Sequence, residues 1–145
     1  MSFISDAISS IRALIINESE IVSRLATWNG VASVHTRSPL PEDSTFPLIS
    51  VGPTEVGQND NSLNSNRLLI VSSLYCYGLN PEHYRSVEEI GNLLRDLFHR
   101  NMALEVAGYS TIGLIAYGPS IAPSEDETIC GKLVSLSIRL LKAGI

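Results

Sequence analysis

The chain has 145 residues, a mass of 15.7 kDa and a formal net charge of −5 at pH 7. This length fits one compact domain that buries about two-thirds of its unfolded surface, so we expect a single domain over residues 1–145. The net negative charge argues against a protein that mainly binds the phosphate groups of nucleic acids. Charged residues make up 17% of the chain, below the roughly 25% usual for soluble domains, which favours burial of some surface against other chains.

Two cysteines, Cys76 and Cys130, lie far apart inside apolar runs, and we interpret both as reduced core thiols. The longest unbroken aliphatic stretches, 13–16 and 68–71, fall far short of a membrane span. The sequence therefore predicts a protein with no membrane partner that is assembled in a cytosol.

The N-terminal third begins with apolar residues at steps of three and four, which predict a helix over 3–16. Asn17 and Glu20 have the spacing of a capping box, so we expect a second short helix that runs to about Thr27. The pair Asn29-Gly30 predicts a turn before a short strand over 31–35. The proline-rich segment that follows, up to Phe46, predicts an extended loop.

The middle of the chain predicts an antiparallel hairpin. One strand covers Leu48 to Val51 and is closed by Gly52-Pro53, and a longer strand covers Arg67 to Tyr77. The segment 55–66 between them is too polar to bury and too long for a tight turn. We expect it to form a protruding arm.

The C-terminal half begins with a helix start at Asn80-Pro81 and an apolar stripe that ends near Asn101. Gly91 inside this helix costs about 1 kcal/mol relative to Ala, which predicts a close backbone contact there. Three strands are expected next, over 104–106, from 109 or 110 to 117, and over 129–141. A second protruding loop, 119–128, carries three consecutive acids.

This order of elements predicts an α+β fold with a mainly antiparallel sheet packed against helices. The passage from the strand 67–77 through the long helix predicts one crossover connection, and we expect a mainly antiparallel, mixed sheet.

No catalytic or cofactor motif stands out. His35, His83 and His99 lack metal-binding spacing, and no Walker loop or GxGxxG occurs. Ser110 lies in a near miss of a nucleophile elbow, but a strand is expected to follow it where the elbow needs a helix. We expect no enzyme, no cofactor and no metal. The alternative from another class is a small α+β hydrolase or ligand-binding domain with a cleft near Tyr109, Ser110 and His99.

The layout as a whole resembles the bacteriophage tail completion family, which includes tail terminator proteins. The resemblance lies in the opening helix pair, the stretch Thr45-Phe46-Pro47-Leu48-Ile49-Ser50-Val51-Gly52 with the polar arm after it, the strand 69–77 ending at Gly78, the helix 84–98 and the closing strand 132–141. It covers nearly the whole chain.

The resemblance implies a structural virion protein of the tail or neck that assembles in the host cytoplasm as a homohexameric ring. Such a ring caps the tail tube, ends tube polymerisation and joins the tail to the head connector, while DNA passes through its lumen. Its implied partners are copies of itself, the tail tube protein and the connector or neck proteins. An alternative within the same class is a head-to-tail adaptor, which also forms a ring.

The size and the charge of the chain are both compatible with a ring that has a lumen for DNA. Six globules of this size, each with a radius of gyration of about 15 Å, enclose a hole roughly one globule wide. Six copies of a −5 chain carry −30 in total, so an acidic lumen repels phosphates and lets DNA slide.

We predict that the two protruding loops carry the contacts to a neighbouring subunit or to the tube, because a ring needs exposed segments that reach its neighbours. The predicted interface residues are Gln58, Asn59, Asp60, Asn64, Asn66, Arg67, Glu125, Asp126 and Glu127. The simpler alternative is that both are disordered surface loops with no contact role.

Overall fold

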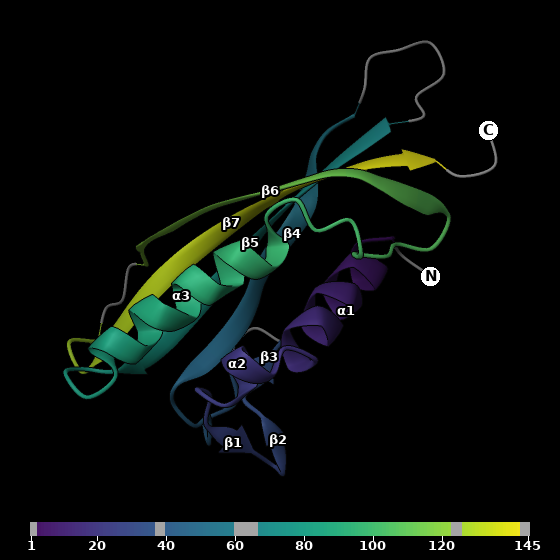
Figure 1. Cartoon of the computed structure of the whole chain (residues 1–145). Coiled ribbons are helices and arrows are strands. Elements are labelled where there is room, and N and C mark those ends of the chain that lie inside the picture. The colour runs from purple at the N-terminus through teal and green to yellow at the C-terminus, as the bar shows by residue number, and fades with distance from the viewer. Residues whose placement is uncertain (1–2, 37–39, 60–66, 123–125, 143–145) are drawn as a thin grey trace.

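A computed structural model describes residues 3–36, 40–59, 67–122 and 126–142. A five-stranded sheet carries two long helices on one face, and a two-stranded hairpin lies at one end of the molecule (Figure 1). The predicted α+β class is confirmed. In chain order the elements are α1 (Phe3–Ile16), α2 (Ser19–Val22), β1 (Thr27–Trp28), β2 (Val31–Ala32), β3 (Val34–His35), β4 (Leu48–Asn59), β5 (Arg67–Leu79), α3 (Tyr84–Phe98), β6 (Tyr109–Ile121) and β7 (Ile129–Lys142).

The strand order in the large sheet is β3-β4-β5-β7-β6. All neighbours run antiparallel except β3 and β4, which run parallel. Since β5 and β6 both flank β7 antiparallel to it, they run parallel to each other and are joined across the sheet by α3. The predicted crossover through the long helix is therefore confirmed.

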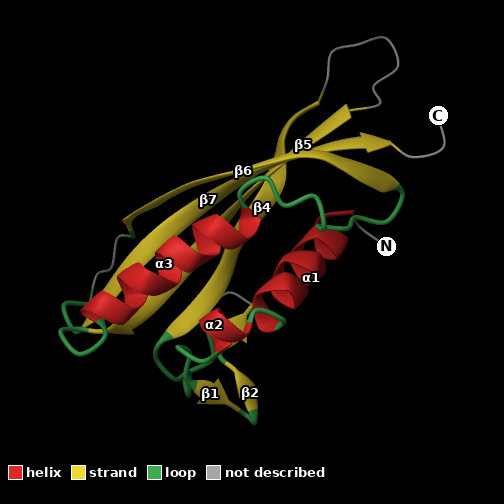
Figure 2. Cartoon of the chain, in the orientation of Figure 1, coloured by secondary structure: helices red, strands yellow, loops and turns green. Residues whose placement is uncertain are grey.

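The core lies between the helices and one face of the sheet (Figure 2). Every second residue of β5 is buried from Leu68 to Gly78, and the same alternation holds in β7 from Val134 to Leu140, as the period of two of a strand requires. Helix α3 packs on β5, β6 and β7, and α1 packs on β3 and β4. The largest fully buried side chains include Ile11 and Ile15 of α1, Ile90, Leu94 and Phe98 of α3, and Ile70, Leu74 and Leu114 of the sheet.

The first helix agrees with the prediction in both bounds, but the second is much shorter than expected. Helix α2 ends at Val22, and Thr27 and Trp28 pair with Ala32 and Val31 in the small hairpin. The predicted capping box is absent, because the cap residue is Glu18 and its side chain makes no capping bond. The turn at Asn29-Gly30 is confirmed, with φ of 51° and 83°.

The long helix begins at Tyr84, four residues later than Asn80, and Asn80 does not cap it. The backbone N–H of Asn80 donates to the carbonyl of Thr128 (2.7 Å), and its side-chain amide donates to the carbonyl of Glu127 (3.3 Å). Asn80, which we expected to cap the helix, thus connects the residues before α3 to the end of the segment between β6 and β7.

Three strand bounds also differ from the prediction. Strand β4 does not stop at Gly52-Pro53 but continues to Asn59, with irregular pairing between Val51 and Thr54. Strand β6 continues to Ile121, so both protruding loops are shorter than predicted. The expected strand 104–106 is reduced to a single bridge between Val106 and Tyr109, although Leu104 and Val106 are buried. Among the described residues, no helix has the length and apolar composition to cross a membrane.

Candidate assembly surfaces

Those predicted interface residues that the structure describes lie at the two opposite ends of the sheet. Arg67 opens β5 opposite Leu141, whereas Leu79 closes β5 opposite Ile129, next to the turn that holds Asp126 and Glu127. At roughly 3.3 Å per residue, the thirteen residues of β5 separate these two groups by about 40 Å. The structure therefore does not bring them into one site.

At the first end, Gln58 and Asn59 are the last residues of β4 and pair with Leu69 and Leu68. Arg67 is exposed. The other three predicted residues of this group, Asp60, Asn64 and Asn66, lie outside the described residues. Part of the predicted arm thus belongs to the sheet, because the strand pairing extends past the polar residues that suggested a loop.

At the second end, residues 126–128 form an ordered turn. One carboxylate oxygen of Asp126 accepts hydrogen bonds from the backbone N–H (2.9 Å) and the hydroxyl (2.6 Å) of Thr128. These two bonds lower the pKa of Asp126 below its usual value, and the bond from the Thr128 hydroxyl has the larger effect. Glu127 is exposed, and Glu125 lies outside the described residues. The hydrogen bonds lie within the turn, and Asp126, Glu127 and Thr128 are all exposed, so its role as a contact surface stays a prediction.

Sequence reasoning missed a third surface, the face of the sheet opposite the helices. We call it the open sheet face, and within the described residues no helix covers it. It carries Leu69 and Val71 of β5, Ile115 and Tyr117 of β6, and Leu133 and Arg139 of β7, which follow from the register of these strands. The sequence of β6 indicates this surface. Ile115 and Tyr117 alternate with the buried Leu114 and Ala116, so both faces of the strand are apolar.

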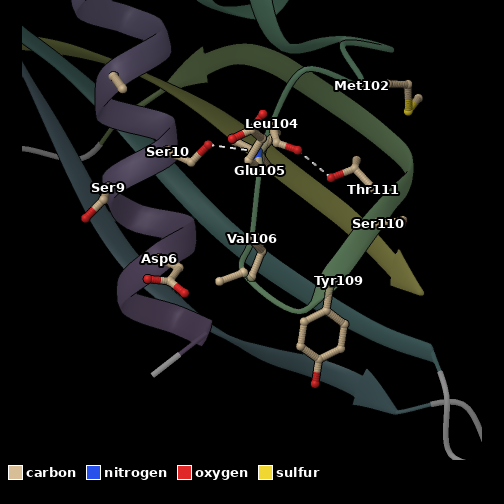
Figure 3. Close-up of a pocket in the computed structure, with 12 residues that line it drawn as sticks. Asp6, Ser9, Ser10, Met102, Leu104, Glu105, Val106, Tyr109, Ser110 and Thr111 are labelled. Carbon is tan, nitrogen blue, oxygen red and sulfur yellow. Dashed lines mark hydrogen bonds between the residues drawn. The ribbon is translucent and has the colours of Figure 1, made fainter. Parts of the chain in front are cut away.

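The cleft expected for a hydrolase does not assemble. A cavity of about 870 Å³ between α1 and the start of β6 is lined by Tyr109, Ser110 and Asp6, but His99 is not part of its lining (Figure 3). The Nδ1 atom of His99 instead accepts a hydrogen bond from the backbone N–H of Ala116 (3.2 Å). Six residues of strand, about 20 Å, separate Ala116 from Ser110, so this histidine does not act as a base for that serine.

The hydroxyls around this cavity serve the local fold. The Ser10 hydroxyl accepts a hydrogen bond from the backbone N–H of Glu105 (2.9 Å), and the Thr111 hydroxyl donates to the carbonyl of Leu104 (2.6 Å). Both bonds fasten the loop before β6 to its neighbours (Figure 3). Among the described residues, no group of three or more His, Cys, Asp or Glu side chains has the arrangement of a metal site.

The two cysteines differ in their surroundings. Cys76 is fully buried on the helix face of the sheet, and burial raises the pKa of its thiol to about 12. Cys130 is only half-buried, and its thiol points to the carbonyls of Gly78 and Leu79. Both are free, and the predicted core position is confirmed for Cys76, whereas Cys130 is partly buried and packs against the edge of the core.

The comparisons with known proteins bear on the fold. No family model and no curated protein matches this chain. Among solved structures, a chain in the virion of a native gene transfer agent particle matches with a TM-score of 0.73 and 11% sequence identity, over 92% of this chain and 93% of that chain. A second structure matches with a TM-score of 0.46 and 13% identity, over 94% and 96% of the two chains, and carries no argument. The chain thus has the fold of a subunit of a virion particle.

Proposed function

We propose that this chain is a structural, non-enzymatic virion protein that acts as a tail terminator. In this role it forms a homohexameric ring on the tail tube, ends tube polymerisation and joins the tail to the head connector, with DNA passing through the lumen. The observation that carries the proposal is the match in fold to a chain of a gene transfer agent virion over nearly the full length of both chains.

The placement of the predicted contact residues supports this role. A ring with rotational symmetry uses heterologous contacts, in which two different surfaces of each subunit meet. The chain offers polar ends about 40 Å apart and between them a sheet face that no described helix covers, so different surfaces are available to neighbours, tube and connector.

The mass of the purified protein tests the ring directly. Light scattering coupled to size exclusion is expected to give a species near 94 kDa, six times the chain mass of 15.7 kDa, and electron microscopy is expected to show rings with an open centre. A protein that stays monomeric both alone and in the presence of tail tubes contradicts the proposal.

Tail length tests the terminator role itself. A particle that lacks this protein is expected to make tails of uncontrolled length, because nothing stops the polymerisation of its tube. Deletion of residues 60–65, which keeps Gln58 and Asn59 in β4, is expected to leave a folded subunit that no longer caps tubes. Normal tail lengths with the deletion variant exclude the arm as the tube contact.

The head-to-tail adaptor remains the second candidate of the same class. It differs from the terminator in the position of its ring, so localisation of the protein in particles by electron microscopy separates the two. A ring on the head side of the neck that does not touch the tail tube favours the adaptor.

A further inference from the structure

Histidines occupy both ends of α3, the long helix that lies along the sheet (Figure 1). His83 is the N-cap residue of this helix and His99 is its C-cap residue. In both side chains the Nδ1 atom accepts a hydrogen bond from a backbone N–H of a strand on which α3 packs. The two rings therefore join the helix to the sheet.

At the first end of α3, His83 forms two hydrogen bonds with Leu79, the last residue of β5. The backbone N–H of Leu79 donates to Nδ1 of His83 (2.9 Å), and the backbone N–H of His83 donates to the carbonyl of Leu79 (2.7 Å). Gly78 permits this approach, because a Cβ atom added to Gly78 would lie 2.5 Å from Cβ of His83. One of the two bonds thus depends on the ring of His83 and the other does not.

The other end of α3 has the same arrangement. The backbone N–H of Ala116 in β6 donates to Nδ1 of His99 (3.2 Å), and the backbone N–H of Arg100 donates to the carbonyl of Leu114 (2.8 Å). Strand β6 is the last strand of the sheet, and proteins commonly cover the polar groups of such an edge with a helix or a loop. The end of α3 covers the middle of this edge.

Only the neutral form of each ring is able to accept these bonds. A neutral imidazole has one N–H and one acceptor nitrogen, whereas an imidazolium donates from both nitrogens. Because the partners in β5 and β6 are N–H donors, the geometry assigns the proton of each neutral ring to Nε2. A proton added to Nδ1 sets two donors against each other and removes the bond. A histidine side chain takes up this proton as the pH falls through about 6.5.

The charged and titratable groups around the two rings offer no ion pair in exchange. Near His83 they are Glu82, Tyr84 and Arg85 in its own segment, Asp126 and Glu127 in the turn bonded to Asn80, and Cys130 of β7. Near His99 they are Arg95, Asp96 and Arg100 at the end of α3, Glu105 in the segment before β6, and Tyr117 of β6, a strand without charged side chains. Within the described residues neither ring forms an ion pair with any of these groups.

The middle of α3 is attached without titrating groups. Ile90 and Leu94 are fully buried in the core, and Gly91 lies against Pro119. These contacts do not depend on the pH. Loss of the bonds at His83 and His99 therefore loosens the ends of the helix while its middle stays packed, which is a local opening below the level of global unfolding.

We propose that His83 and His99 form two pH-sensitive clamps, which hold the ends of α3 on the sheet when the rings are neutral and release them when the rings are protonated. Release at His99 frees the N–H of Ala116, so acidic pH uncovers this part of the edge of β6. The inference concerns the single subunit and does not depend on the proposed ring.

Nitrogen NMR of the histidine rings in the full-length chain tests the neutral state. At pH 7.5 both His83 and His99 are expected to be Nε2–H tautomers, because Nδ1 accepts a bond in each. An Nδ1–H tautomer at either position overturns the clamp at that end of α3, and this measurement needs no variant.

Amide hydrogen exchange, corrected for the intrinsic effect of pH on exchange, tests the release. Between pH 7.5 and pH 5.5 the protection of the Leu79 and Ala116 amides is expected to fall at least tenfold, while that of Ile90 and Leu94 changes less than threefold. Equal losses at all four amides mean that the whole domain opens and overturn the proposal. Constant protection at the two ends also overturns it.

Two substitutions assign the response to the histidines. Asparagine places a carbonyl oxygen near the position of Nδ1 and does not titrate. His83→Asn is expected to abolish the pH response at Leu79 and keep it at Ala116, and His99→Asn is expected to do the reverse, so each variant is the matched control for the other. Circular dichroism checks that both are folded. A response that persists at the substituted end belongs to another group and overturns the clamp there.

Discussion

The ring of Pro119 lies directly on the backbone of Gly91, so that a Cβ atom added to Gly91 would lie 2.8 Å from Cβ of Pro119. This contact seats the middle of α3 on the end of β6 and explains why a glycine occupies the interior of the longest helix. The sequence-based prediction of a close contact at Gly91 is confirmed, and the partner is a proline from the segment predicted as a loop.

The Gly91→Ala variant tests this contact. Alanine favours the helix by about 1 kcal/mol, but a contact below 3.0 Å forces a shift between helix and strand that costs about 1–3 kcal/mol. We expect a net loss of about 1 kcal/mol in the free energy of unfolding, measured in urea. The control is Asn92→Ala on the exposed side of α3, which is expected to be neutral or slightly stabilising, and a Gly91→Ala variant as stable as this control contradicts the contact.

A second prediction tests the assignment of the two sheet faces in β7. Ile138 is fully buried and pairs with Leu114 and Ile70, whereas its neighbour Ser137 points to the open sheet face. Ile138→Ala is expected to cost about 2–5 kcal/mol, because it removes core contacts and leaves a cavity. Ser137→Ala is expected to cost less than about 0.5 kcal/mol. Similar losses in the two variants mean that the register of β7 is wrong.

A third prediction concerns the pH dependence of the turn after β6. The hydrogen bonds from Thr128 lower the pKa of Asp126 below its ordinary value of 3.8. A carboxylate whose pKa is lower in the folded state stabilises the fold above its unfolded pKa, and this contribution is lost as the pH falls through the folded pKa.

Carboxyl titration by NMR checks this assignment. Thr128→Ala removes the hydroxyl and keeps the backbone donor, so the pKa of Asp126 is expected to move part of the way back towards 3.8. An unchanged pKa shows that the hydroxyl does not contribute. It would contradict the hydrogen bond from the Thr128 hydroxyl that holds this turn at the end of the sheet.

A fourth prediction separates the two thiols. With a pKa of about 12, only about one Cys76 in ten thousand is ionised at pH 8, and burial shields it further. A thiol reagent is therefore expected to label one cysteine per native chain, at Cys130, and two after denaturation. Cys130→Ser is the control and is expected to reduce native labelling to near zero, and labelling of Cys76 in this native variant would show that its strand opens readily.

Local sequence patterns determined much of the fold. The three- and four-residue steps of α1, the aliphatic and aromatic composition of β5 and the turn at Asn29-Gly30 depend on neighbouring residues, and these three elements were predicted from the sequence. The α+β class and the crossover through α3 follow from the order of these elements.

Tertiary contacts decided the features that depend on distant partners. Asn80 bonds to Glu127 and Thr128 instead of capping α3, and β4 continues past Pro53 because β5 lies beside it along its length. The open sheet face arises only once β6 and β7 are in register and α3 covers one side. An apolar residue at an alternate position of a strand gives the same sequence pattern whether the core or another molecule buries it. Only the folded sheet therefore shows which apolar side chains stay exposed on the surface.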